Sequence, residues 1–257
     1  QTAPARWSER IRLVVLPQLN PDGAEHFSRR NAQQIDINRD ARARESPEMR
    51  VFWQVLEREK PHWCFNLHDQ RSLFSVGAEQ RPATLSFLAA AAGPQNADSE
   101  ARARSQQLIG GTVSRLPESW RSGMGRYSEE YYPTALGDNL HREGYSTVLI
   151  EAGAAVEDPQ REVARHRCWA FLVRALEWIG EAEDQISSNT LTDAYKALPL
   201  NDQGRRDLIF RSCSIANPDG TQTSLDLGFR QEEMAHRDSG QLHRRWILSD
   251  VGELAHL

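Results

Sequence analysis

The chain of 257 residues carries a formal net charge of −5, with 39% hydrophobic and 26% charged residues. That length and balance are typical of a globular protein with one large domain, or one domain and a small appendage. Its 31 lysine and arginine residues are interspersed with acids, so the basic face that nucleic-acid binding needs is not predicted. No apolar run approaches the ~20 residues that span a bilayer, and no membrane partner is expected.

The three cysteines, Cys64, Cys168 and Cys213, are far apart and have no Cys-x-x-Cys spacing. They predict neither a disulfide framework nor a zinc site made of thiolates. A reducing compartment suits them, and the first ten residues lack the charged-then-apolar order of a signal peptide. We therefore expect a cytoplasmic location.

The N-terminal part begins with a predicted buried strand, the apolar and β-branched run at residues 11–19. It ends at an Asn-Pro-Asp-Gly tetrapeptide, residues 20–23, whose residue types are those of a turn. Residues 28–40, which we call the 28–40 loop, then place arginine, asparagine and aspartate side chains close together. Such polar segments are mostly solvated surface. This loop is a candidate site only if other chemically active side chains lie beside it.

A helix is predicted over residues 46–60, where Ser46 can cap the first turn and Pro47 suits the first helical position. The next predicted strand, residues 62–68, ends in His68. Further on, residues 127–132 bring three tyrosines into one short segment. Aromatic packing in a loop is an equally good interpretation of those tyrosines.

A third predicted strand, residues 145–153, carries Glu151 near its end, and a helix follows from Asp158 until Gly180. Strands that alternate with helices predict an α/β fold, in which a mixed, largely parallel sheet is flanked by helices. Residues 1–183 are predicted to form this part.

Residues 184–193 form a predicted polar linker. After it, the sequence consists of short runs in which apolar and polar residues alternate. Residues 207–215 and 223–231 flank a second Asn-Pro-Asp-Gly copy and predict a β-hairpin. Residues 184–257 are therefore expected to form a small β-rich C-terminal domain, in which the second copy is only a turn.

Three chemically active segments are expected at one edge of the sheet. Ligands of parallel sheets bind just beyond the carboxyl ends of the strands, where His68 and Glu151 both lie. Each residue alone has a structural explanation, because a lone histidine is most often a satisfied core or surface residue. Together with the 28–40 loop, they predict a single crevice.

The order and spacing of these segments resemble the zinc carboxypeptidase family, the carboxypeptidase A-like metallopeptidases. The quoted segments are LNPDGA, Arg-x-Asn, DINRD, FNLHDQR and IEAG, and they span roughly residues 11–180. The amino-acid sequences of these segments are most similar to those of bacterial members that carry a small β-rich tail. The resemblance implies a zinc-carboxypeptidase-like fold and a zinc-dependent hydrolase that cleaves a C-terminal peptide bond.

The same resemblance assigns the catalytic roles. His68 matches a zinc ligand, and Glu151 matches the general base that takes a proton from the zinc-activated water and delivers it to the leaving amine. Arg29 matches the arginine that stabilises the oxyanion, and Arg30 is the alternative if the register slips by one residue. Asp36 matches a carboxylate that orients a zinc-ligating histidine further upstream.

Substrate binding is assigned in the same way. Asn38 and Arg39 match the pair that binds the terminal carboxylate, because a planar guanidinium contacts a carboxylate through two hydrogen bonds. Tyr127 and Tyr132 are candidates for a tyrosine that closes over the substrate. The expected partner is a peptide or small amide with a free carboxylate.

The chain departs from the family in its metal ligands. The family's other two zinc ligands come from a His-x-x-Glu motif well before the Asn-Pro-Asp-Gly turn, yet only 19 residues precede Asn20 here. None of the eight histidines is followed by Glu or Asp three positions later. We therefore expect one of three zinc ligands in this chain and an N-terminally incomplete catalytic domain. Ala154 also stands where close relatives tend to have a histidine.

Two other functions fit the same residues. An N-acyl amino acid amidohydrolase of the related branch would share the arginine, Asp-x-Asn-Arg and glutamate positions while cleaving a small acyl amide. A catalytically inactive module could bind peptide C-termini through Asn38 and Arg39. The sequence predicts neither the side-chain specificity nor the oligomeric state.

Overall fold

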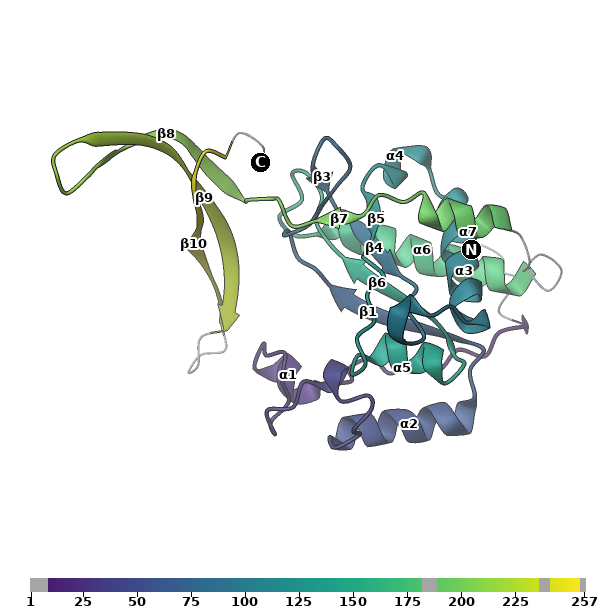
Figure 1. Ribbon diagram of the computed structural model, residues 1–257. Coiled ribbons are helices and arrows are strands. Elements are labelled where there is room, and N and C mark those ends of the chain that lie inside the picture. Colours follow the sequence, from purple (N-terminus) through teal and green to yellow (C-terminus); the bar gives the residue numbers. More distant parts are fainter. Residues whose placement is uncertain (1–8, 182–188, 236–240, 255–257) are drawn as a thin grey trace.

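The computed structural model describes residues 9–181, 189–235 and 241–254, which form an α/β body and a separate antiparallel sheet (Figure 1). The helices of the body are α1 (Pro21–Glu25), α2 (Pro47–Glu59), α3 (Glu100–Ser114), α4 (Glu118–Arg121), α5 (Leu136–Arg142), α6 (Glu162–Glu181) and α7 (Asn189–Lys196), with short 3-10 turns η2 (Ile37–Arg39) and η3 (Pro94–Asn96). The strands of the body are β1 (Trp63–Asp69), β2 (Ser75–Val76), β3 (Arg81–Pro82), β4 (Leu85–Leu88), β5 (Met124–Arg126), β6 (Ser146–Ala152) and β7 (Asn201–Asp202).

The central sheet of the body has the strand order β1-β6-β4-β5. Strands β1 and β6 are parallel, as are β4 and β5, whereas β4 runs antiparallel to β6. The prediction of an α/β fold with a mixed, largely parallel sheet is therefore confirmed. A small antiparallel sheet, β3-β2-β7, lies beside it.

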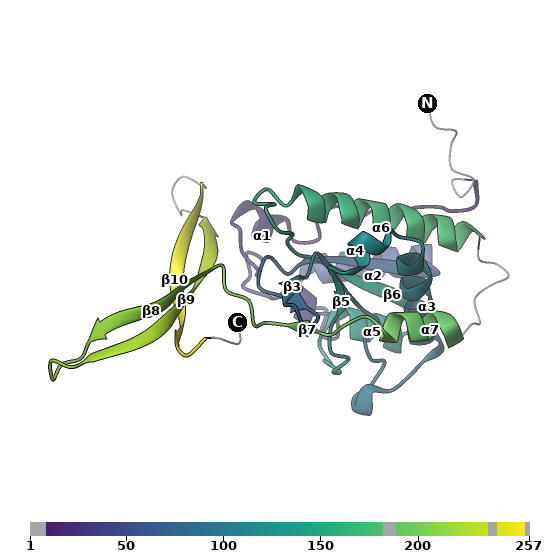
Figure 2. The ribbon, with the colours of Figure 1, turned by 90° about the horizontal axis from the view of Figure 1, so that it is seen from above.

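Helices cover both faces of the central sheet (Figures 1 and 2). On one face, side chains of α3, α6 and α7 pack against β4 and β6 in the larger core, with Phe87, Phe171, Trp178 and Tyr195 fully buried. On the other face, α2 and α5 form a second core with residues of η2, including Met49, Trp53 and Leu140. The strands thus present odd and even residues to two different cores, as the period of a β-strand requires.

The helix predicted from Ser46 is confirmed in detail. The Ser46 hydroxyl accepts a hydrogen bond from the Met49 amide at 3.2 Å, and Lys60 ends the helix in a left-handed conformation. The second predicted helix, α6, begins three residues later than Pro159, and the Asp158 carboxylate accepts hydrogen bonds from its first amides. Gly180 does not end this helix, because its last turn continues to Glu181.

The strand predicted at residues 11–19 is wrong. These residues form no strand, and Leu13, Val14, Val15 and Leu16 are between 42% and 63% exposed. Apolar, β-branched composition favours an extended chain, but a strand also needs a neighbour to hydrogen-bond with. Among the described residues the run has no such neighbour, and β1 at the sheet edge pairs with β6 alone.

The polar linker predicted at residues 184–193 is also partly wrong, and its residues 184–188 lie outside the described part of the chain. Residues from Asn189 form helix α7, whose Tyr195 is fully buried in the larger core. The Tyr195 hydroxyl accepts a hydrogen bond from the Ala89 amide at 3.2 Å. Helix α7 and β7 thus pack with the α/β body, although both follow the boundary expected between residues 183 and 184.

The C-terminal residues form a three-stranded antiparallel sheet, β8 (Leu208–Ala216), β9 (Gln222–Ala235) and β10 (Leu242–Gly252), in the order β10-β9-β8. The predicted hairpin of β8 and β9 is confirmed, and its turn is the second Asn-Pro-Asp-Gly copy. Gly220 has a φ of 84°, which a glycine adopts without strain. None of the helices in the described ranges combines the length and apolar character needed to cross a membrane.

Replacing Tyr195 with phenylalanine tests whether α7 is part of the body. The change leaves the buried Ala89 amide without its acceptor, so we expect a loss of about 1–3 kcal/mol in the free energy of unfolding. Urea denaturation measures this loss. Tyr132→Phe, which removes an exposed hydroxyl, is the matched control and should change stability by less than about 0.5 kcal/mol. Equal effects of the two variants would contradict the packing of α7.

Candidate functional site

The pairing of β1 with β6 brings the two strand-end residues together. His68 and Glu151 are direct partners in the parallel register, so their side chains leave the sheet on the same face. That face is the one covered by α2 and α5, because Cys64, two pleats before His68 on β1, packs in their core. The sequence predicts that these two side chains lie close together, and this register places them side by side.

The half-buried His68 differs from His141, the fully buried histidine of the described body. Both ring nitrogens of His141 have partners: Nδ1 lies 2.6 Å from the Ala90 carbonyl, and Nε2 accepts from the Thr147 amide at 3.1 Å. The ring of His68 makes no hydrogen bond with any described residue. His141 is therefore a satisfied structural histidine, whereas the nitrogens of His68 remain available to a ligand.

Burial and nearby charges perturb both members of the pair. Burial, and then the charges of Arg29 and Arg39, lower the pKa of His68 to about 4, so its imidazole is neutral at pH 7. Burial and the nearby Asp69 carboxylate raise the pKa of Glu151 to about 7, against the opposing effect of Arg29. The Oε2 atom of Glu151 is buried and has no hydrogen-bond partner among the described residues. A carboxylate in this state can give or take a proton near neutral pH.

The first Asn-Pro-Asp-Gly copy is a helix start that fixes the 28–40 loop. The Asn20 side chain accepts from the Gly23 amide at 2.9 Å and donates to the Arg29 carbonyl at 3.2 Å. Asp22 accepts from the Ala32 amide. A Cβ on Gly23 would meet the Ser28 carbonyl oxygen at 2.4 Å, so glycine is required here for close approach and not for a positive φ. The tetrapeptide thus shapes the loop that carries the arginines.

Arg29, and not Arg30, is directed toward the pair. The Arg30 guanidinium donates to the Gln34 carbonyl at 2.6 Å and closes a turn within the loop. The Arg29 Nε donates to Asp36 Oδ2 at 2.7 Å, and its charge acts on both His68 and Glu151. The Asp36 carboxylate, assigned by resemblance to an upstream histidine, is therefore bonded to Arg29 in the described structure.

The expected carboxylate-binding residues lie on the 3-10 turn η2. Its buried Ile37 anchors the turn in the core beneath α5, while Asn38 is partly exposed and Arg39 is exposed. The Arg39 guanidinium carbon lies 5.7 Å from the centre of the Tyr132 ring. Arg39 also opposes the effect of burial on Asp138, whose pKa is raised to about 6. The Arg39 charge is therefore shared between His68, Tyr132 and Asp138.

The two candidate tyrosines are held very differently. Tyr127 donates to Gln70 Oε1 at 2.7 Å and packs edge-on against Phe74, and burial together with the Glu151 charge raises its pKa. Tyr132 is 48% exposed, and its hydroxyl donates a hydrogen bond to the Glu130 carboxylate at 3.0 Å. Tyr127 is thus a fixed wall beside Glu151, while Tyr132 is the better placed of the two to close over a ligand.

A polar network behind Glu151 was not predicted. Gln70 donates to the Ala83 carbonyl and to the hydroxyl of Ser86, the residue paired with Glu151 across β4 and β6. Asn201 donates to Gln70 Oε1 at 3.1 Å and accepts from Ser86 at 2.9 Å. Gln70 directly follows the His68 segment and could have been noticed, but nothing in the sequence connects Asn201 with this site.

The described residues do not by themselves fit a zinc ion. They contain no group of three or more His, Cys, Asp or Glu side chains placed to hold a metal. Zinc sites in proteins use three or four protein ligands, and the neutral imidazole of His68 is a single candidate ligand.

Comparisons of this chain with protein-family models, with curated proteins and with solved structures found no match. The resemblance to zinc carboxypeptidases stays a prediction that depends on the residues themselves.

The raised pKa of Glu151 predicts a pH-dependent effect of the Glu151→Gln variant. Since the folded pKa of about 7 exceeds the usual 4.5, the contribution of Glu151 to stability is present below pH 4.5 and lost as the pH rises through 7. Glutamine removes this loss, so the metal-free variant should exceed the wild type in stability at pH 8 by about 3 kcal/mol, with little difference at pH 4.5.

Urea denaturation with a chelator at the two pH values measures the difference. Glu143→Gln is the control, because Glu143 is exposed at the end of α5. A stability change of the same size at both pH values would show that Glu151 titrates as an ordinary surface carboxylate.

Proposed function

We propose that this protein is a metallocarboxypeptidase, a hydrolase that cleaves the peptide bond next to a free C-terminal carboxylate. The observation that carries the proposal is the pairing of His68 with Glu151 under the charges of Arg29 and Arg39. A proton-transfer group, an oxyanion donor and a carboxylate-binding cation are the parts that such a reaction needs, and all three lie around one histidine.

Glu151 is the proton-transfer group in this proposal. With a pKa of about 7, it is able to take the proton of an attacking water and pass it to the departing amine at neutral pH. Its Oε2 is buried and has no hydrogen-bond partner among the described residues, so desolvation acts on this carboxyl group. The Tyr127–Gln70 network keeps the wall beside it rigid.

Arg29 is the donor for the negative charge that develops on the carbonyl oxygen. Its Nε is bonded to Asp36, which fixes the guanidinium while its two Nη groups make no hydrogen bond with the described residues. A fixed cation with free donors stabilises an oxyanion without reorganising during the reaction.

Arg39 and Asn38 are the groups that select a chain end. A guanidinium binds a carboxylate through two parallel hydrogen bonds, and an internal peptide offers no anion at that position. Tyr132, next to Arg39, would then cover the bound end. A zinc ion at His68 would require two further protein ligands, which the described residues do not place beside it.

The test compares N-benzoyl-glycyl-phenylalanine with its C-terminal amide, in a zinc-loaded form of the protein that carries the two further ligands. Release of phenylalanine should depend on the free carboxylate. We expect Arg39→Ala to raise KM roughly 30-fold with little change in kcat, because it removes a charge-assisted contact to the chain end. Glu151→Gln should lower kcat at least 100-fold with little change in KM.

Three results would contradict the proposal. Unchanged turnover in Glu151→Gln would exclude its role in proton transfer. Tight binding of the dipeptide without cleavage would favour a non-enzymatic module. Faster cleavage of an N-acetyl amino acid than of the dipeptide would favour an amidohydrolase.

A further inference from the structure

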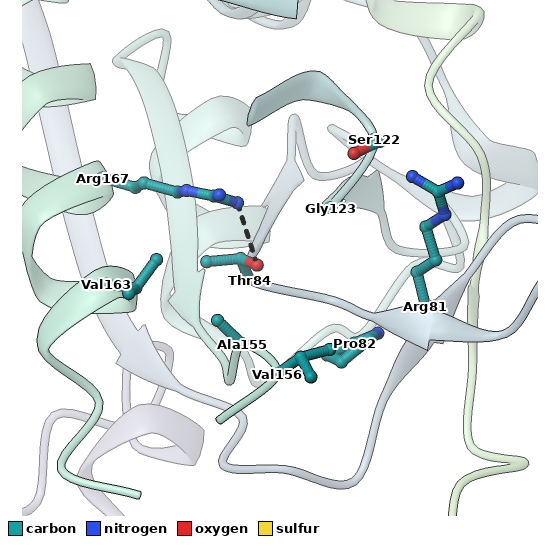
Figure 3. Close-up of a pocket in the computed structure, with 9 residues that line it drawn as sticks. All are labelled: Arg81, Pro82, Thr84, Ser122, Gly123, Ala155, Val156, Val163 and Arg167. Atoms are coloured by element: carbon teal, nitrogen blue, oxygen red, sulfur yellow. Dashed lines mark hydrogen bonds between the residues drawn. The ribbon is translucent and has the colours of Figure 1, made fainter. Parts of the chain in front are cut away.

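Two adjoining pockets lie beside the α/β body, on the side of α6. The first, of about 430 Å³, lies between the start of β4, the turn before β5 and helix α6 (Figure 3). The second, of about 400 Å³, lies between the β3 turn and the residues that lead into β8. Both are lined by Arg81, Pro82 and Val156, so they form one continuous surface, which we call the arginine groove.

Arg167 is the first cation of the groove without a bonded carboxylate. It extends from α6 toward Thr84, on the side of the pocket opposite Arg81 (Figure 3). Its Nη1 donates to the Thr84 hydroxyl at 3.2 Å, which is its one hydrogen bond within the described residues. Burial lowers its pKa, although the Asp158 charge acts in the opposite direction. This guanidinium is therefore partly removed from water without a direct anionic partner.

Arg205 is the second such cation. Its Nη1 is buried and has no hydrogen-bond partner among the described residues. Burial lowers its pKa, and the Asp207 charge opposes that effect without a hydrogen bond. The rest of the Arg205 side chain is partly exposed and lines the second pocket, so an anion bound there would face a guanidinium that has no bonded carboxylate.

The other two arginines of the groove are already neutralised. Arg81 is bonded to Glu79 at 2.5 Å, and Arg206 is bonded to Asp250. Glu79 is the one acidic residue in the lining of either pocket. The remaining lining is largely apolar, with Pro82, Ala155, Val156, Val163 and Ile209. Two positive charges thus remain in a partly apolar groove.

We propose that the arginine groove binds an acidic peptide segment, with Arg167 and Arg205 each holding one carboxylate. The two cations line separate pockets on either side of Arg81, which suits two carboxylates spaced along a chain better than a single phosphate. Apolar walls between them suit the methylene groups of glutamate side chains. Guanidinium groups bind carboxylates through paired hydrogen bonds, a geometry that lysine does not reproduce.

The groove and the candidate site involve neighbouring stretches of the chain but different faces of the central sheet, because Arg167 extends from α6 whereas His68 and Glu151 face α2 and α5. Thr84 precedes Ser86, the partner of Glu151, by two residues, about 7 Å along β4. Val156 follows Glu151 by five residues. Binding of a peptide in the groove therefore does not depend on the proposed function.

The test is a binding measurement with fluorescently labelled (Glu-Gly)3 and (Gln-Gly)3, both amidated at the C-terminus. Amidation removes the terminal carboxylate expected to contact Arg39, so binding reports on the groove alone. Fluorescence anisotropy should show at least tenfold tighter binding of the acidic peptide. Arg167→Gln and Arg205→Gln should each weaken it at least fivefold. The control Arg165→Gln, an exposed change on the same helix with the same loss of charge, should weaken it less than twofold.

Equal affinity for the two peptides would overturn the proposal, and so would an equal loss in Arg165→Gln. Circular dichroism of each variant shows whether the fold persists, and retention of the fold in either Arg167→Gln or Arg205→Gln is sufficient for the test. If acidic peptides bind but no peptide is hydrolysed, the groove proposal is supported and the proposed function is contradicted. If hydrolysis occurs but acidic and neutral peptides bind with equal affinity, only the groove proposal fails.

Discussion

The parallel pairing of β1 with β6 is the constraint on which the candidate site depends. It places His68 and Glu151 side by side on one face of the sheet, although 82 residues separate them in the chain. A shift of one residue in this register would move one of the two side chains to the opposite face. The tight cores on both faces, with Phe171 and Trp178 on one and Met49 and Trp53 on the other, make such a shift costly.

The electrostatic character of the site follows from this placement. Desolvation favours the neutral form of both groups, and the two arginines of the 28–40 loop further disfavour a charged imidazole. The result is a neutral histidine with free nitrogens beside a carboxyl group that titrates near neutrality. The ionised Glu151 lowers the stability of the folded state above neutral pH, and such perturbed groups are typical of sites that a protein retains for chemistry.

The sequence predicts much of this arrangement because strand ends and helix caps leave strong local patterns. Ser46, Pro47 and the apolar spacing after them predict α2 to within a residue, and the run before His68 predicts β1. Residues 11–19 have an equally strong strand pattern and form no strand, since composition cannot show whether a neighbouring strand is present. The roles of Asn201 and helix α7 depend on contacts between residues far apart in the chain, which no local pattern contains.

The most direct test of the account is an NMR titration of His68 in the metal-free protein. We expect its ring to titrate near pH 4, and its pKa to rise in Arg29→Gln and in Arg39→Gln because each variant removes a nearby positive charge. Arg30→Gln should leave the titration unchanged, since that guanidinium is bonded within its own loop. A pKa of His68 near 6.5 that none of the three variants changed would contradict the account. The imidazole and the two guanidinium groups would then not lie in one site.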